Sequence, residues 1–355
     1  MDYPFTAVLT CKGCTYNCIT CGGSCNAFKN FFNRDRPAFK SPQRLVEEIN
    51  VISEYFKAPI FLIGDLRQGG RRWAERVLGG IKESGLDNTI TYELFDAVPM
   101  DWMERLSGST DKWTLEISPE SHDDEIRKTM GKPYTTAQME DTIDSALKHG
   151  AEKIDVFFMV GLSGQTPKSA LESIEYAKHL YDAMDNNKKI FAFTSPMAPF
   201  LDPGSMVYED PERYGFTRLY STLREHKQAL HQPSWKLYLS YETNWMTRDQ
   251  IAETTYEAMI RLNQLKMDVG ITSRSKGEKV SYGLNIARTI MQRIDQIIDS
   301  TSDPYERQKK YNELKIEIDE AKKSTGLAKQ ELRMPGLAGL RVRGAVKYLL
   351  NYLGL

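Results

Sequence analysis

Short apolar runs alternate with amphipathic stretches through the first two hundred residues of this 355-residue chain. Residues 60–63 are wholly apolar and suit a strand buried on both faces of a parallel sheet. Further strands are expected at residues 3–9, 89–95, 112–117, 153–160 and 189–194, which gives about six strand–helix units. Such alternation favours a parallel sheet with right-handed crossovers, either a barrel or an open doubly wound sheet.

The helices between these strands carry local start and stop signals. Ser41-Pro42 pairs an N-cap residue with a proline at the first helical position. Thr135-x-x-Gln138 is a capping box, and Gly150 is placed to end the helix that it begins. Helices are also expected over residues 73–81 and 167–184. These signals agree with the apolar pattern and strengthen the α/β assignment.

The character of the chain changes near residue 234. We predict an α/β domain over residues 1–233 and a mostly helical extension over residues 234–355. Residues 235–241 are expected to form a last strand or an extended lid, and the Thr247-x-x-Gln250 capping box predicts a helix to about residue 266. Further helices are expected over 282–298 and 304–323, and the tail 341–355 is expected to be a packed helix.

Composition and charge exclude several classes of protein. The net charge of −1 gives no general basic field for nucleic acid, and no apolar run approaches the length of a membrane span. The N-terminus lacks a signal-peptide pattern, so the protein is expected to be cytoplasmic. Five cysteines, an odd number, in a reducing compartment favour metal or redox chemistry over a disulfide framework.

All five cysteines lie within residues 11–25, directly after the first predicted strand. Cys14, Cys18 and Cys21 have the spacing C-x3-C-x2-C, which lets one short loop wrap three thiolates around a compact metal centre. Reactive loops of α/β sheets gather at the carboxyl ends of the strands, which is where this loop lies. The loop is therefore the candidate functional site.

Three metal centres compete for this loop. Structural zinc would use the pairs Cys11/Cys14 and Cys18/Cys21, but only three residues separate the pairs, which is tight for closing a tetrahedron. A bacterial ferredoxin cluster needs C-x2-C-x2-C, a run that this chain does not provide. The third is a 4Fe–4S cluster held by three cysteines, whose fourth iron is free to bind a small molecule. An electron-transfer cluster is less consistent, because it would be expected to have four protein ligands.

The loop resembles the radical SAM superfamily, whose signature is C-x3-C-x2-C at the end of the first barrel strand. The preceding Thr10-Cys11-Lys12-Gly13 is similar to the lead-in of the branch that also carries cobalamin-binding domains. The resemblance implies a partial (β/α)6 TIM-like barrel followed by a helical C-terminal extension. It also implies a 4Fe–4S cluster on Cys14, Cys18 and Cys21, with S-adenosylmethionine on the fourth iron.

Weaker motifs over residues 5–215 extend the resemblance to contacts with S-adenosylmethionine. Ile63-Gly64-Asp65 is similar to the turn that meets the methionine amino group, and residues 115–121 are similar to a Gly-x-Glu-Ser segment that meets the ribose or methionine end. Residues 159–166 are similar to a turn whose backbone meets adenine. The cofactor-binding residues implied are Gly64, Asp65, Ser118, Glu120, Arg127 (a methionine carboxylate partner), Met159 and Gly161. Ordinary structural explanations also fit: Glu120 can be a helix-start acid, and residues 161–166 a strand-to-helix turn.

The sequence departs from the family pattern at Thr20, where the family usually has an aromatic residue that packs near adenine. Tyr16 or Phe28 would then supply that packing. Cys11 and Cys25 exceed the motif, and a structural function is the simpler expectation for both.

The resemblance implies that reduced flavodoxin or ferredoxin supplies an electron, and that S-adenosylmethionine is cleaved to methionine and a 5′-deoxyadenosyl radical. The radical then takes a hydrogen atom from an unidentified substrate, for methylation or rearrangement of carbon. Cobalamin would need a domain outside this chain, since no Asp-x-His-x-x-Gly run is present. No catalytic residue is assigned, and Trp235, Tyr238, Tyr241 and Trp245 are expected to be core more than pocket. The alternative is an α/β binding module that zinc or a cluster only staples.

Overall fold

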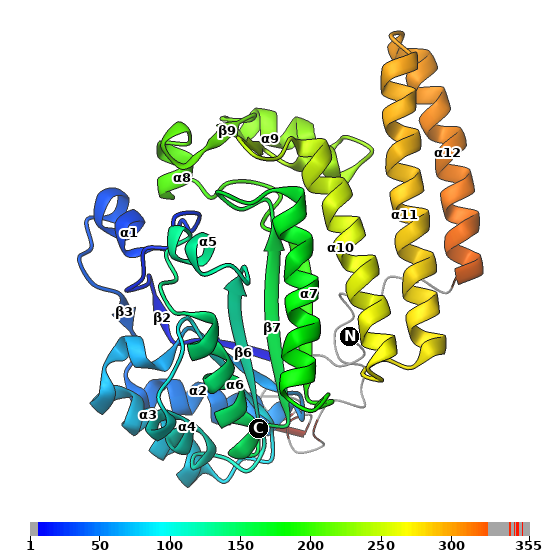
Figure 1. Cartoon of the computed structure of the whole chain (residues 1–355). Helices are drawn as coiled ribbons and strands as arrows, with labels where there is room; N and C mark the ends of the chain where they lie inside the picture. The colour runs from blue at the N-terminus through cyan, green and yellow to red at the C-terminus, as the bar shows by residue number, and fades with distance from the viewer. Residues whose placement is uncertain (1–5, 326–340, 342–343, 345, 348–349, 351–355) are drawn as a thin grey trace.

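The computed structural model describes residues 6–325, 341, 344, 346, 347 and 350 (Figure 1). Its centre is a six-stranded sheet in which every neighbouring pair is parallel. The strands in spatial order are β1 (Thr6–Leu9), β4 (Ile60–Ile63), β5 (Ile90–Leu94), β6 (Trp113–Glu120), β7 (Lys153–Val160) and β8 (Ile190–Pro196). Since β1 and β8 are edges and do not pair, the sheet is a partial barrel of the predicted type.

Helices connect these strands and cover the outer face of the sheet (Figure 1). They are α2 (Pro42–Tyr55), α3 (Arg71–Ser84), α4 (Met100–Ser107), α6 (Thr136–Lys148) and α7 (Pro167–Ala183). The Ser41 side chain caps α2, and both halves of the Thr135–Gln138 capping box form at α6, as predicted. Helix α4 has no counterpart among the predicted helices. Two shorter helices, α1 (Cys25–Phe32) and α5 (Asp124–Thr129), lie at the carboxyl ends of the strands.

Side chains alternate strictly between the two faces of the central strands. On β6, Leu115 and Ile117 are fully buried beneath the helices, whereas Glu116 between them is only partly buried. The same alternation runs along β5 and β7. The hydrophobic core therefore lies between the sheet and its helices, and the inner face carries the more exposed side chains.

The segment after β8 differs from the predicted last strand or lid at residues 235–241. Residues Trp235–Tyr238 form one turn of 3-10 helix, and a short strand β10 (Tyr241–Thr243) pairs antiparallel with β9 (Phe216–Arg218). Two short helices, α8 (Met206–Glu209) and α9 (Leu223–Leu230), complete this segment. Tyr241 is fully buried against Phe216, so it packs in the core.

Three long helices end the described chain. Helix α10 (Arg248–Asp268) packs on α7 and β8, and α11 (Arg274–Ser300) and α12 (Pro304–Thr325) form a hairpin that projects from the barrel (Figure 1). Buried Lys236 ties this hairpin down, since its ammonium lies 2.8 Å from the Asp249 carboxylate and 2.5 Å from that of Asp295.

Helix α11 begins eight residues before the predicted residue 282. Gly277 lies inside it where α10 packs close, since a Cβ at this position would clash with the Met267 side chain. Most of the predicted tail helix, residues 341–355, lies outside the described residues. Within the described part of the chain, no helix is long and apolar enough to cross a membrane.

Candidate cofactor site

The cysteine loop is fixed at its start by the neighbouring strand. The Thr10 side chain and backbone N–H both donate to the Ile63 carbonyl, at 2.9 and 3.1 Å. Directly after Thr10, β2 (Cys11–Lys12) pairs with β3 (Ala38–Phe39). Gly13 has φ +90°, and a Cβ there would lie 2.9 Å from the Phe28 ring, so only glycine suits the turn. Phe28 thus packs under the loop.

The loop also closes on itself. The backbone N–H of Cys21 donates to the Cys18 carbonyl at 3.2 Å, and that of Cys25 donates to the Tyr16 carbonyl at 2.9 Å. All five cysteines are free thiols and partly buried. Cys25 opens α1, and the Cys11 thiol donates to the Gly13 carbonyl at 3.2 Å, which gives both of them local structural contacts.

Backbone amides point at two of the three motif sulfurs. Tyr16 N–H donates to Cys14 Sγ at 3.4 Å, and Gly23 N–H donates to Cys21 Sγ at 3.3 Å. Burial raises the pKa of Cys14 to about 12 and that of Cys18 to about 11, and it also raises the pKa of Cys21. Thiolates in such surroundings need a nearby positive centre, which a bound metal supplies.

The donor set can be compared with what a single metal ion and a cluster each require. In the part of the chain that the structure describes, no three Cys, His, Asp or Glu side chains converge closely enough to hold one metal ion. A tetrahedral zinc site needs its sulfurs at about 2.3 Å from a single ion. A 4Fe–4S cluster gives each cysteine its own iron and spreads the sulfurs over a larger volume. Three partly buried thiols on one loop suit the second arrangement.

A buried lysine that the sequence reading missed lies beside this loop. Lys132 Nζ is 2.9 Å from Glu120 Oε1, donates to the Ser118 carbonyl at 2.5 Å and electrostatically lowers the pKa of Cys18. Lys132 lies beside the loop because its neighbour Gly131 packs directly against it. A Cβ on Gly131 would lie 2.6 Å from the Asn17 carbonyl oxygen. A lone lysine in a turn looks solvent-exposed in the sequence, so only the contact with a distant loop identifies it.

Two polar atoms near Lys132 are buried without a partner. Glu120 Oε2 and the Tyr134 hydroxyl find no hydrogen-bond partner among the described residues, although both residues are more than nine-tenths buried. Glu120 also has φ +66°, in the left-handed region that a β-carbon disfavours. Unsatisfied buried polar atoms are costly in a folded protein. A bound polar ligand or a water molecule would satisfy both atoms.

Gly64 and Asp65 follow β4, next to the loop. Gly64 has φ +106°, its N–H donates to Glu93 Oε2 at 2.6 Å, and a Cβ would clash with the Thr10 hydroxyl at 2.5 Å. The fully buried Asp65 carboxylate pairs with Arg67 and accepts from the Phe95 N–H at 3.1 Å. The predicted contact of these two residues with the methionine amino group stays a prediction.

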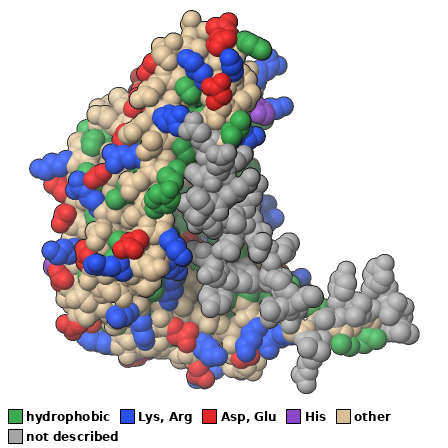
Figure 2. Space-filling model, turned by 90° about the vertical axis from the view of Figure 1, so that its right-hand side faces the viewer, with side chains coloured by type: hydrophobic (Ala, Val, Ile, Leu, Met, Phe, Trp, Pro, Cys, Tyr) green, Lys and Arg blue, Asp and Glu red, His purple; other side chains and the backbone are tan. Residues whose placement is uncertain are grey.

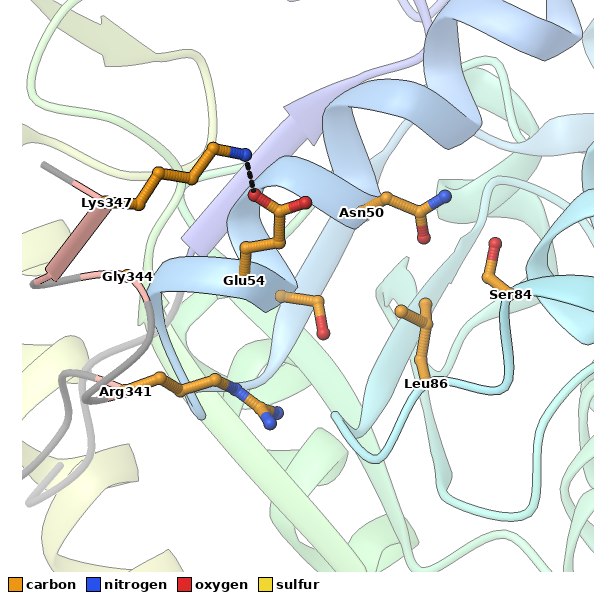
Figure 3. Close-up of a pocket in the computed structure, with 8 residues that line it drawn as sticks. Asn50, Glu54, Ser84, Leu86, Arg341, Gly344 and Lys347 are labelled. Atoms are coloured by element: carbon orange, nitrogen blue, oxygen red, sulfur yellow. Dashed lines mark hydrogen bonds and ion pairs between the residues drawn. The ribbon is translucent and has the colours of Figure 1, made fainter. Parts of the chain in front are cut away.

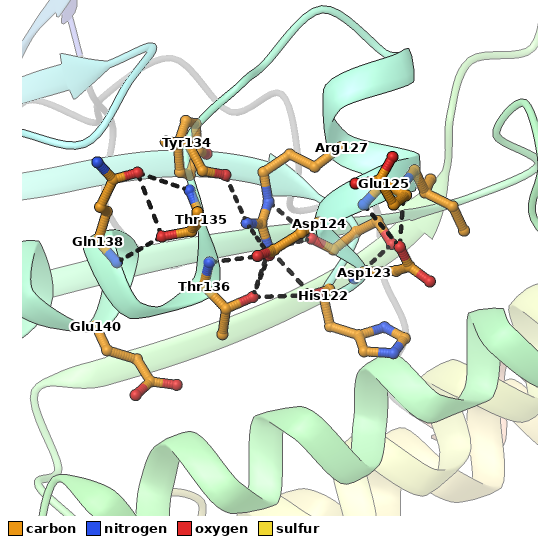
Figure 4. A network of polar contacts seen from close by, with 12 residues as sticks. His122, Asp123, Asp124, Glu125, Arg127, Tyr134, Thr135, Thr136, Gln138 and Glu140 are labelled. Atoms are coloured by element: carbon orange, nitrogen blue, oxygen red, sulfur yellow. Dashed lines mark hydrogen bonds and ion pairs between the residues drawn. The ribbon is translucent and has the colours of Figure 1, made fainter.

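Arg127 has a different set of partners from the predicted carboxylate. Its fully buried guanidinium donates to the carbonyls of Ser121 and Tyr134 and to Asp124 Oδ1, which holds the segment around α5 together (Figure 4). Further bonds reach the His122 carbonyl and the Thr136 hydroxyl, so each of its three nitrogens already donates. The predicted contact with the methionine carboxylate is untested, and Lys132 is the buried cation nearer to the cysteine loop.

The Gln165 side chain holds the turn after β7 through two hydrogen bonds to its backbone. Gln165 accepts from the Gly161 N–H at 2.8 Å and donates to the Met159 carbonyl at 3.0 Å. Gly161 has φ +96°, and a Cβ would lie 2.9 Å from the Tyr241 hydroxyl. The turn is therefore rigid, and its predicted contact with adenine stays a prediction.

The inner face of the sheet holds a second group of residues that the sequence reading missed. Glu93, Glu116 and Asp155 are direct neighbours across β5, β6 and β7. Burial, followed by repulsion from the other two carboxylates, raises the pKa of Glu116 to about 7. Nearer the carboxyl ends of the strands, Phe157 and Phe193 stack with their centroids 4.8 Å apart. The period-2 pattern places these residues on one face, but only the register makes them neighbours.

A pocket at the amino-terminal ends of the strands is separate from this site. It lies between the end of α2, the residues before β5 and the described C-terminal residues (Figure 3). Lys347 Nζ pairs with Glu54 at 2.7 Å there, and Arg341 pairs with Asp87. Both cations already have acidic partners, and parallel sheets gather their chemistry at the opposite strand ends.

Comparison of the sequence with known protein families finds a match to one family model. Residues 8–177 match the family model of the Radical SAM superfamily. An uncharacterised methyltransferase of Pyrococcus horikoshii is 25% identical over 207 residues, which are 58% of this chain and 42% of that protein. An uncharacterised protein of Methanocaldococcus jannaschii is 30% identical over 86 residues, 24% of this chain and 19% of that protein. The chain thus spans less than half the length of these curated relatives.

Similar solved structures include two S-adenosylmethionine radical enzymes. The radical S-adenosylmethionine methyltransferase TsrM of Kitasatospora setae is 12% identical with a TM-score of 0.47, over 62% of this chain and 42% of that one. The cobalamin-dependent S-adenosylmethionine radical enzyme OxsB is 13% identical with a TM-score of 0.45, over 97% of this chain and 52% of that one.

Proposed function

We propose, from the match of residues 8–177 to the Radical SAM family model, that Cys14, Cys18 and Cys21 hold a 4Fe–4S cluster. The cofactors of this enzyme class are the cluster and S-adenosylmethionine, and it needs a reductant. The observation that carries the proposal is a loop of three partly buried free thiols, two of them already accepting backbone N–H bonds. These bonds favour the thiolate form that a metal needs.

We propose that S-adenosylmethionine lies between the cysteine loop and the ends of β4, β6 and β7. The two buried, unpartnered oxygens on Glu120 and Tyr134 support this position, since a polar ligand would satisfy them. Lys132 supplies a buried positive charge for the methionine carboxylate, in preference to the fully engaged Arg127. Gly64 and Asp65 remain the proposed contacts of the methionine amino group. The rigid turn at Met159 to Gly161 remains that of adenine.

Held by Cys14, Cys18 and Cys21, a 4Fe–4S cluster would supply the electron for reductive cleavage of S-adenosylmethionine to methionine and a 5′-deoxyadenosyl radical. The protein's own share is to bind, to orient and to exclude water. The inner face below the loop, with its carboxylates and the Phe157–Phe193 pair, is the surface that a substrate would meet. No single residue is assigned to hydrogen abstraction.

For the reaction class we propose transfer of a methyl group to carbon, with rearrangement of a carbon skeleton as the second candidate. Support for methylation comes from the Pyrococcus horikoshii relative, which is named a methyltransferase. The alternative outside this class remains a zinc- or cluster-stapled binding module. The proposed electron donors are flavodoxin and ferredoxin.

The test begins with anaerobic reconstitution and analysis of iron and sulfide. We expect a brown protein that, with dithionite and S-adenosylmethionine, yields methionine and 5′-deoxyadenosine. Cys18→Ser is expected to abolish this product, whereas the matched control Cys25→Ser keeps it. A colourless zinc protein, or a cluster without 5′-deoxyadenosine, would overturn the proposal. Methyl-deuterated S-adenosylmethionine then follows the methyl group: label on the substrate-derived product supports methylation, whereas label found in methionine alone would favour rearrangement.

A further inference from the structure

A cavity of about 480 Å³ lies between the segment after β8 and the α11–α12 hairpin, and we call it the hairpin cavity. Its walls come from α9, the 3-10 turn before β10, the start of α10, the end of α11 and the start of α12. Figure 1 shows α9 and the turn between α11 and α12 at the same end of the molecule. The hairpin cavity shares no lining residue with the proposed cofactor site, and its volume is in the range of small-molecule sites.

Two arginines line the hairpin cavity without an acidic partner. Among the described residues, no carboxylate forms an ion pair with Arg248 or Arg307, although both side chains are partly buried. On α11, by contrast, Arg288 pairs with Glu253 at 2.8 Å and with Glu257 at 3.0 Å. A partly buried cation without a counter-ion is unfavourable, so an anion in the cavity would lower the free energy of the folded protein.

Hydrogen bonds to neighbouring groups orient both guanidinium groups and leave donors over. Arg248 Nη1 donates to the Tyr220 hydroxyl at 3.1 Å, and that hydroxyl donates to the Leu237 carbonyl at 2.9 Å. Arg248 Nε is buried and has no hydrogen-bond partner in the described part of the chain. Arg307 donates to the Thr301 carbonyl through Nε at 3.0 Å and Nη2 at 2.6 Å, whereas its Nη1 bonds to no described residue. Each arginine is therefore held in place with N–H groups to spare.

Glu225 is the one acid among the residues that line the hairpin cavity, and it is already engaged. Its carboxylate accepts from the backbone N–H groups of Ser221 and Thr222, both at 2.8 Å, and from the Thr222 hydroxyl at 3.0 Å. The lining thus carries two guanidinium groups against one carboxylate that caps α9. Positive and negative side chains are interspersed over the face on the side of the hairpin (Figure 2), so the positive excess belongs to the cavity and not to that whole face.

We propose that the hairpin cavity binds a phosphorylated small molecule, whose phosphate group accepts hydrogen bonds from Arg248 and Arg307. Planar guanidinium groups match phosphate oxygens, and a phosphate group has enough oxygens to accept from two arginines at once. The Tyr220 and Tyr311 rings line the space for the part of the ligand that carries no charge. A bound ligand would tie α9 to the hairpin. The inference does not depend on the cluster.

Isothermal titration calorimetry of the full reconstituted chain tests the proposal, with phenyl phosphate as the probe and benzoate as its carboxylate counterpart. We expect saturable binding of phenyl phosphate at one site, tighter than the binding of benzoate. Arg248→Gln should weaken this binding by at least about tenfold, because charge-assisted hydrogen bonds are lost. Arg248→Lys keeps the charge without the planar fork and should lie between the two.

A matched control and a second readout separate binding in the hairpin cavity from general charge and from misfolding. Arg72→Gln removes an exposed arginine on α3 that forms no ion pair with a described residue, and it should leave the affinity unchanged. Amide hydrogen exchange locates the site. Phenyl phosphate should slow exchange in residues 223–230 and 304–311 of wild type, because it bridges α9 and the hairpin. In Arg248→Gln the same concentration should have little effect on exchange.

Three results would overturn this inference. They are no saturable binding of phenyl phosphate to wild type, equal affinity in Arg248→Gln and wild type, and an equal loss of affinity in Arg72→Gln. If benzoate binds as tightly as phenyl phosphate, the cavity takes carboxylates and the assignment to phosphate is wrong. None of these results depends on formation of 5′-deoxyadenosine, whose absence would overturn the proposed function instead.

Discussion

The two faces of the central sheet are made by the same strands yet differ in every physical respect. On β6, Leu115 and Ile117 are fully buried among helices, while Glu116 between them faces the barrel interior. The outer face is apolar and closely packed. The inner face places Glu116 beside Glu93 and Asp155, a row of three acids on adjacent strands.

The outer face of the sheet stabilises the fold, whereas the inner face carries the polar side chains near the proposed cofactor site. Like charges on neighbouring strands repel, so the inner row costs folding free energy. Burial raises the pKa of all three carboxyls, which is the signature of groups held where water does not solvate them well. The outer face stabilises the fold, and the inner face keeps unfavourable polar groups next to the proposed cofactor site. Substitutions on the two faces should therefore have opposite kinds of effect.

The largest loss of stability is expected at the buried Lys132–Glu120 ion pair beside the cysteine loop. Lys132→Met leaves the Glu120 carboxylate buried without its partner and should lower the free energy of unfolding by about 3–5 kcal/mol. Anaerobic urea denaturation of the metal-free protein measures this. The double variant Lys132→Met with Glu120→Gln removes both charges and should recover part of the loss. No recovery would mean that the lysine acts through packing.

On the outer face, Ile117→Ala should cost about 2–5 kcal/mol, because a fully buried side chain is lost and a cavity remains. Its neighbour Glu116→Gln, on the inner face, should not lower the free energy of unfolding at neutral pH and should tend to raise it, because it removes a carboxylate whose pKa burial raises. The free energies of unfolding of the two variants and of wild type are measured by urea denaturation under identical conditions. Equal losses at the two positions would contradict the division between the faces.

The inner face should also give stability a pH dependence. The pKa of Glu116 is raised from its ordinary 4.5 to about 7 in the folded protein. The folded state therefore keeps a proton that the unfolded chain loses, so the free energy of unfolding falls as pH rises from about 4.5 to about 7. Above that window Glu116 has lost its proton in both the folded and the unfolded state, so this contribution to the free energy of unfolding is lost.

Glu116→Gln should make the dependence on pH shallower. Part of the slope should persist, because the pKa values of Glu93 and Asp155 are raised in the same direction. Denaturation of wild type and variant across this pH range gives the two curves. Superimposable slopes would show that Glu116 titrates normally.

The smallest effect is expected at a neutral pair on the inner face. Thr114 donates to the Thr91 hydroxyl at 2.8 Å, and both side chains are partly exposed. Thr114→Val removes this bond and should cost no more than about 1 kcal/mol, since water replaces the lost partner. A thermal unfolding scan against wild type detects the change. A loss as large as that of Ile117→Ala would mean that the inner face is packed like the outer one.

Local signals predicted most of the fold. Strands β4 and β7 have the bounds expected from their apolar runs, and the capping boxes at Thr135 and Thr247 form as predicted. These features depend on neighbours within four residues. Helix α11 begins earlier than its sequence predicts, because Gly277, a residue that disfavours helices locally, is accommodated where α10 packs too closely for a side chain.

The site was predicted less completely, for a physical reason. The cysteine spacing is a local signal, whereas the burial of Lys132 results from Gly131 pressing on a loop far away in the sequence. The inner acids are neighbours only through the register of three strands, which no short stretch of sequence encodes. The contact of Arg127 with the ligand stays a prediction, and its bonds to carbonyls of its own segment could not be predicted because they depend on how that segment folds.

The most direct test of the central claim is electron paramagnetic resonance of the reduced, reconstituted cluster, recorded with and without S-adenosylmethionine. If three cysteines hold the cluster and the fourth iron is open, the spectrum of wild type changes when S-adenosylmethionine binds. The Cys11→Ala and Cys25→Ala variants should respond in the same way. A cluster signal that S-adenosylmethionine leaves unchanged, or that disappears with Cys11 or Cys25, would contradict the three-cysteine site.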